Sequence, residues 1–240
     1  MEQQWFPQDK EELNNVLEKF LKEKSKASIS NTHGLIVPHA GYEFSGKIAG
    51  KAFSLLKNSK KKKAIIIGPS HYMGFTGVKV LENIETPLGK IKLIPSNFNA
   101  IAFENIPHEH SVKNQVPFLQ KLGFEEILPL VVGDVGNEEA KKIANYISEI
   151  KNAVYIFSTD LSHFNNYNKA VKKDRNSIKI IKDLDLQNWE KIDACGSSAL
   201  LVLMHLCKLK NWKPKLIEYK NSGDVTEDKS SVVGYASFYF

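Results

Sequence analysis

Arginine is almost absent from this chain of 240 residues. Arg175 is the only arginine, and lysine supplies the rest of the 33 basic side chains. Proteins that read nucleic acids depend on arginine, whose planar guanidinium makes bidentate bonds to bases and phosphates. The net charge of +6 at pH 7 therefore reads as a lysine-rich solvated surface, and the composition argues against a nucleic-acid partner.

Cysteine and long apolar runs are scarce as well. The two cysteines, Cys195 and Cys207, are too few for a disulfide framework and suit a reducing compartment. The longest apolar stretch, residues 199–206, is interrupted by His205 and is far shorter than the ~20 residues that span a membrane. The first residues lack the basic and apolar regions of a secretory signal. We therefore expect a cytoplasmic protein with no membrane partner.

Several common catalytic motifs are missing. The sequence Gly68-Pro69-Ser70-His71-Tyr72 lacks the final glycine of a nucleophile elbow. Neither a P-loop nor the three-glycine dinucleotide fingerprint occurs, and the cysteines are too far apart for a Cys-x-x-Cys zinc site.

The elements that are present alternate between strand and helix. Three apolar runs, at 35–37, 64–67 and 154–157, are short, β-branched and not alternating, which is typical of strands buried on both faces. We expect further strands at 126–132, 215–219 and 231–240, a hairpin of 77–82 with 90–94, and helices at 8–23, 45–56, 111–122, 137–150, 166–182 and 195–209. This order predicts one α/β domain, residues 1–240, with a mainly parallel sheet and helices on both faces.

A histidine follows each of the three buried runs. His39, His71 and His163 lie in short polar loops just after their strands, beside small or turn residues. Ligands bind at the carboxyl ends of strands in open α/β sheets. We therefore expect these three histidines to share a metal or acid–base site. We expect His33, His108 and His205 to be ordinary hydrogen-bonded loop or core residues.

Other polar residues add candidates to this site. Cys195 is placed at an expected helix start, which favours the thiolate form, but a free cysteine is also often a small buried hydrophobe. Asp160 lies three residues before His163 and could orient a histidine or relay a proton. Glu109 and His110 are either further pocket residues or a favourable helix N-terminus.

The motifs together resemble the Memo family, which is also labelled component B of the AmmeMemoRadiSam system. The matching segments run in order through the chain and include Val37-Pro38-His39-Ala40-Gly41-Tyr42, Gly68-Pro69-Ser70-His71, Glu109-His110-Ser111, Ser158-Thr159-Asp160-Leu161-Ser162-His163 and Cys195-Gly196.

The resemblance implies a fold like that of type III extradiol ring-cleavage dioxygenases. It implies a metal pocket made of His39, His71 and Cys195, with Asp160 and His163 as supporting catalytic residues. Copper or iron is the implied metal, and zinc also suits two imidazoles and a thiolate.

Three functions remain open from the sequence. The first is a redox-metal protein, in the form of an oxidoreductase, acting on an unknown small molecule or peptide in the pocket. The second is a non-enzymatic scaffold that binds a peptide or partner in a dioxygenase-like pocket. The third is metal-free thiol chemistry, with Cys195 as nucleophile and His39 or His71 as its base.

Overall fold

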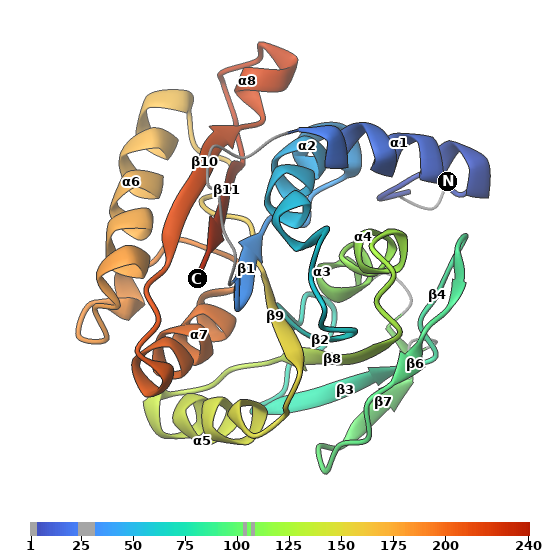
Figure 1. Cartoon of the computed structure of the whole chain (residues 1–240). Coiled ribbons are helices and arrows are strands. Elements are labelled where there is room, and N and C mark those ends of the chain that lie inside the picture. Colours follow the sequence, from blue (N-terminus) through green and yellow to red (C-terminus); the bar gives the residue numbers. More distant parts are fainter. Residues whose placement is uncertain (1–3, 24–31, 103–104, 107–108) are drawn as a thin grey trace.

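The computed structural model in Figure 1 describes residues 4–23, 32–102, 105–106 and 109–240. Its helices are α1 (Lys10–Lys22), α2 (Tyr42–Phe53), η1 (Ser54–Leu56), α3 (His110–Lys113), α4 (Val116–Lys121), α5 (Asn137–Ser148), α6 (Tyr167–Asp183), η3 (Trp189–Lys191), α7 (Ser197–Lys210) and α8 (Gly223–Thr226). Its strands are β1 (Gly34–Val37), β2 (Lys63–Pro69), β3 (Val78–Glu82), β4 (Glu85–Thr86), β5 (Gly89–Lys90), β6 (Lys92–Leu93), β7 (Ala100–Ala102), β8 (Glu126–Val132), β9 (Ala153–Ser158), β10 (Lys215–Asn221) and β11 (Gly234–Tyr239).

One large mixed sheet organises the domain. Its strand order is β10-β11-β1-β9-β2-β8-β3-β7, with β6 paired to β8. The central strands β1, β9, β2 and β8 are mutually parallel, whereas β10 and β11 on one side and β3 on the other join antiparallel. The predicted α/β class with a mainly parallel sheet is therefore confirmed.

Helices cover both faces of this sheet, as predicted (Figure 1). Along β1 and β2, Ile36, Ile65 and Ile67 pack in one core with side chains of α5, α6 and α7. The alternate residues Leu35 and Ile66 pack in a second core with side chains of α1, α2, α3 and α4. Because each buried side chain of this size contributes about 1.5–3 kcal/mol, the two cores fix the central strands firmly.

Two local predictions differ from the structure. Strand β3 does not form a hairpin with the segment near residue 92; it pairs with β7 and β8, and β6 pairs with β8. The only local pairing there is the short ladder of β4 with β5 around the turn at Thr86–Gly89. The helix expected at 111–122 is divided into α3 and α4, since Pro117 lies in the first turn of α4, where its missing N–H costs nothing.

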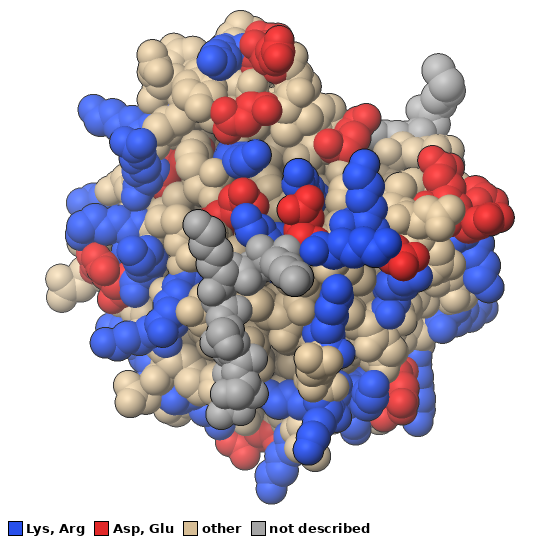
Figure 2. Space-filling model, turned by 45° about the horizontal axis from the view of Figure 1, so that its top comes forward, with Lys and Arg blue, Asp and Glu red and all other residues tan. Residues whose placement is uncertain are grey.

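The surface carries lysines and acidic residues side by side over much of the face seen in Figure 2. Basic side chains also project along its left edge, the side on which α6 lies in Figure 1. Within the described part of the chain, no helix is both long enough and apolar enough to cross a membrane.

Candidate metal centre

The loops that follow β1, β2 and β9 lie at the same edge of the sheet. Val37 of β1 is in register with Ser158 of β9, and Ile67 of β2 is in register with Phe157 of β9. Because these strands are parallel, the chain leaves all three at the same edge, as open α/β sheets do at their ligand sites. His39 and His71 each lie two residues beyond the last residue of their strand.

Three imidazoles meet at this edge. One ring nitrogen from each of His39, His71 and His110 lies within 4.8 Å of the others. The rings of His71 and His110 are stacked with centroids 4.6 Å apart, and His39 stands nearly perpendicular to both, at 5.1 Å and 5.2 Å. His39 and His110 are buried, whereas part of His71 is exposed to solvent. The structure therefore presents a three-histidine group that could hold a metal ion.

His110 is the member of this group that the histidine pattern missed, because it begins a helix rather than following a strand. Helix α3 lies directly against the end of β2: a side chain on Gly68 would meet the Ser111 hydroxyl at 2.7 Å. The Ser111 hydroxyl also donates a 2.7 Å hydrogen bond to the carbonyl of Pro69. The signal in the sequence is the polar run Glu109-His110-Ser111, which fits either a pocket or a helix start.

Glu109 holds His71 in place. Its fully buried carboxylate accepts hydrogen bonds from the backbone N–H of His71 at 2.7 Å and of Ser111 at 3.1 Å, and it lies 3.0 Å from His71 Nδ1. Burial acts to raise the pKa of Glu109, but the hydrogen bonds and charge of His71 outweigh it and lower the pKa to about 2. The permanent carboxylate therefore keeps the proton on Nδ1 and leaves Nε2 of His71 free for a ligand.

His39 is held by a hydroxyl at its ring and by a carboxylate at its backbone. Its Nδ1 lies 3.0 Å from the Ser158 hydroxyl, and its backbone N–H donates to Asp160 Oδ1 at 2.8 Å. Burial, together with the charge of His71, lowers the pKa of His39 well below 6.5. Burial followed by the charges of His39 and His71 lowers the pKa of His110 to about 3. Both rings are therefore neutral at pH 7, which is the form that binds metals.

Cys195 lies against His39 but outside the three-histidine group. Its Sγ is 3.3 Å from His39 Nε2 and 3.3 Å from the backbone N of Asp160. Bonds of about 2.0 Å to nitrogen and 2.3 Å to sulfur at a tetrahedral angle would place two such ligand atoms about 3.5 Å apart, so this pair fits one shared ion. The ligand role of Cys195 stays a prediction.

The thiolate expected at Cys195 is not favoured without a metal. The helix begins at Ser197 with Gly196 as its N-cap, so Cys195 lies just before the helix. Burial, followed by the charge of Asp160, raises the pKa of the Cys195 thiol to about 12. A bound cation would reverse this, since a coordinating thiol is deprotonated. The metal-free nucleophile is therefore the function that the site supports least.

Asp160 and His163 flank this group. The buried Asp160 carboxylate has Oδ2 4.0 Å from His39 Nε2, and burial raises its pKa. The charge of His163 is near enough to affect the pKa of both His39 and Asp160. Asp160 thus lies beside His39, whereas the placement of His163 in the pocket and the catalytic roles of both residues stay predictions.

Aromatic side chains surround the histidines. The Trp5 ring stacks on His110 with centroids 3.6 Å apart and only 8° between the planes. Tyr72 and Phe164, which directly follow His71 and His163, are 50% and 78% exposed. The Tyr72 ring lies 6.3 Å from both the His71 and the His110 ring, and the Phe164 ring lies 5.6 Å from the His163 ring.

The remaining histidines lie elsewhere. His33 stacks on Trp212 at 4.3 Å, and His205 lies 3.2 Å from Asn137 Oδ1. Both have the ordinary packing roles expected for them, whereas His108 falls outside the described residues.

Comparison with known proteins identifies close relatives of the whole chain. The family model described as "Memo-like protein" matches residues 3–239. A MEMO1 family protein of Nitrosopumilus maritimus is 31% identical over 99% of this chain and 96% of its own length. One from Thermoplasma volcanium is 32% identical over 97% and 94%, and one from Methanococcoides burtonii is 36% identical over 85% and 84%.

Proposed function

Because this chain belongs to the Memo-like family, we propose that it is a redox-metal protein, with His39, His71 and Cys195 holding one copper or iron ion. His110 supplies a further nitrogen to the same centre. The observation that carries the proposal is the convergence of three ring nitrogens within 4.8 Å, together with the buried carboxylate that orients one of them. Such carboxylate–histidine pairs are a recurrent support of metal ligands.

The donor set favours a soft or borderline metal. Imidazoles and a thiolate select copper, iron or zinc over magnesium and calcium, which prefer oxygen ligands. A bound copper or iron ion would supply one-electron redox chemistry and Lewis acidity at this edge of the sheet. Zinc is the non-redox ion that the same residues accept.

The surrounding residues would handle protons and position the substrate. The buried Asp160 carboxyl has Oδ2 4.0 Å from His39 Nε2, and burial raises its pKa, so an acidic group is placed near this ring for exchanging a proton. We assign proton transfer to Asp160 and His163, and recognition of an apolar or aromatic substrate to the exposed Tyr72 and Phe164. In this form the protein is an oxidoreductase.

The test is the absorption spectrum of the protein loaded with Cu(II) under anaerobic conditions. We expect a copper–thiolate band that is lost in Cys195→Ser. Cys207→Ser is the matched control, because Cys207 is fully buried in the core and lies near the C-terminal end of α7, whereas Cys195 precedes the N-terminus of that helix. A spectrum unchanged by Cys195→Ser would remove the sulfur from the ligand set.

A second candidate function is a scaffold that binds a partner without turnover. The exposed Tyr72 and Phe164 favour it, since aromatic side chains are enriched at protein interfaces. Under this function Phe164→Ser weakens partner binding, and removal of the metal leaves binding intact. Partner binding that disappears with the metal would contradict it.

A further inference from the structure

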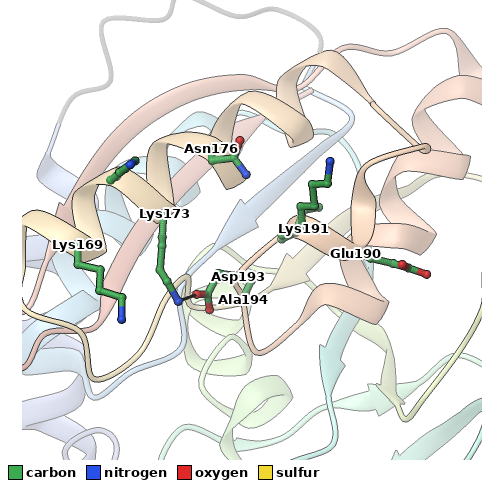
Figure 3. Close-up of a pocket in the computed structure, with 9 residues that line it drawn as sticks. Lys169, Lys173, Asn176, Glu190, Lys191, Asp193 and Ala194 are labelled. Atoms are coloured by element: carbon green, nitrogen blue, oxygen red, sulfur yellow. Dashed lines mark hydrogen bonds and ion pairs between the residues drawn. The ribbon is translucent and has the colours of Figure 1, made fainter.

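A hollow lies between α6 and the segment that joins η3 to α7, which leads along the chain to Cys195. It is an open groove with a volume of about 760 Å³, lined by Lys169, Lys172 and Lys173 of α6 and by Lys191, Ile192 and Asp193 opposite. Figure 3 shows α6 along one bank and the 190–194 segment along the other. We call this hollow the lysine groove. Its volume is within the range of about 300–1,000 Å³ that holds small ligands.

The lysines of α6 face the groove because of their spacing. Residues 169, 172, 173 and 176 recur at helical intervals of three and four, so they form one stripe along the helix. Figure 3 shows Lys169 and Lys173 on the same side of α6, with Lys173 reaching Asp193. Lys173 Nζ spans the groove to Asp193 Oδ2 at 2.6 Å, which ties the two banks together.

Of the four lysines that line the groove, Lys169 and Lys172 have ammonium groups available to bind a ligand. The groove has four lysines against two carboxylates, those of Glu190 and Asp193. Lys173 is paired with Asp193, and Lys191 donates to Asn188 at 2.7 Å. Lys169 and Lys172 make no ion pair or side-chain hydrogen bond among the described residues. Glu190 points away from Lys169 and Lys173 in Figure 3, so it does not neutralise them.

The groove is separate from the metal centre but touches it through the chain. Ala194 lines the groove, and the next residue, Cys195, contacts His39. The backbone N–H of Asp193 donates to the buried Ser177 hydroxyl of α6, which fixes this segment on the helix. The groove and the histidine group are therefore connected by one short segment, residues 193–195, that is anchored on α6.

We propose that the lysine groove binds a small anion with two or more phosphate or carboxylate groups. Lysine ammonium groups recognise such anions as point charges, without the planar geometry that arginine requires. A groove of about 760 Å³ fits a small molecule rather than a nucleic acid or a protein surface. This site goes beyond the proposed redox function and does not depend on which metal the centre holds.

The test is calorimetric titration of the full chain at low ionic strength with two probes. Fructose 1,6-bisphosphate represents phosphorylated ligands, and tricarballylate represents carboxylates. We expect saturable binding of at least one probe with a Kd of about 1 mM or tighter, weakened by added salt. The probe that binds more tightly identifies the class of anion.

Variants of α6 locate the binding. Lys169→Ala/Lys172→Ala should weaken binding about fivefold or more, because two ammonium contacts are lost. Lys179→Ala/Lys182→Ala makes the same charge change on the same helix outside the groove and should leave the affinity unchanged. Asp193→Asn should tighten binding, since it removes a negative charge and releases Lys173.

Three results would overturn the proposal. Neither probe binds saturably up to about 10 mM; both double variants lose affinity equally, which would indicate a general charge effect; or Asp193→Asn binds more weakly. Circular dichroism of each variant confirms that the fold is retained, so that a loss of binding is assigned to the groove.

Discussion

Replacement of the buried Glu109 by glutamine is the perturbation whose size the structure determines best. The carboxylate accepts two backbone N–H groups and faces His71 Nδ1. A glutamine side chain keeps the shape but has one acceptor oxygen, and it presents N–H hydrogens to groups that are donors. The fall in the pKa of Glu109 from 4.5 to about 2 corresponds to about 3 kcal/mol of folding stability at neutral pH.

The pH dependence of this loss follows from the sign of the shift. The folded protein holds the ionised carboxylate more tightly than the unfolded chain does, so the contribution is complete above about pH 5 and is lost as the pH falls toward 2. At pH 3 about 2 of the 3 kcal/mol are gone. Glu109→Gln should therefore cost about 3 kcal/mol at pH 7 and about 1 kcal/mol at pH 3.

Urea unfolding of the metal-free protein at both pH values measures the difference. Glu82→Gln is the matched control, because Glu82 is an exposed carboxylate on β3 and should change stability by less than about 0.5 kcal/mol. Glu109→Gln should also weaken metal binding about 10- to 100-fold, because the His71 ring is no longer held in place. A loss of stability that is equal at pH 7 and pH 3, or equal to that of the control, would refute the reasoning.

Three further predictions concern the same edge of the sheet. In the metal-free protein the ring of His110, with its pKa lowered to about 3, should show no NMR titration between about pH 8 and 5. The folded protein should lose stability as the pH falls below about 6.5, because only the unfolded chain then takes up a proton at this residue. An NMR titration midpoint near 6.5 in the folded protein would contradict this. Cys195, with its pKa raised to about 12, should be alkylated by iodoacetamide far more slowly at pH 7.5 in the folded metal-free protein than in urea, as followed by mass spectrometry; rapid alkylation of the folded protein would restore the thiol mechanism. Gly68→Ala should lower the unfolding free energy by about 1–3 kcal/mol in a melting experiment, because the added Cβ would meet the Ser111 hydroxyl at 2.7 Å. Gly74→Ala is the control and should be neutral, because nothing lies within 4 Å of the added Cβ. Equal melting temperatures for the two variants would show that α3 can move away.

The buried strands were predictable because their signal is local. The runs at 64–67 and 154–157 are apolar without alternation, and the structure places both in the middle of the sheet. The loops that follow them could be assigned to one edge from parallel topology alone, which is why His39 and His71 were found.

Features that depend on contacts between distant segments were not predictable. His110 reaches the site only because α3 packs on the end of β2 at Gly68, and nothing in the spacing near residue 110 encodes that contact. The antiparallel pairing of β3 with β8 replaces the expected hairpin for the same reason, since a strand's partner is decided by the assembled sheet. The thiol of Cys195 is governed by burial and Asp160, which the helix-start pattern could not reveal.

The measurement that tests the central claim most directly is the metal content of the protein isolated anaerobically from its native host. We predict about one copper or iron ion per chain in the wild type, and none retained in a variant with both His39→Ala and His71→Ala. Equal metal content in the wild type and in this variant, or no metal in either, would contradict a metal centre at this edge of the sheet.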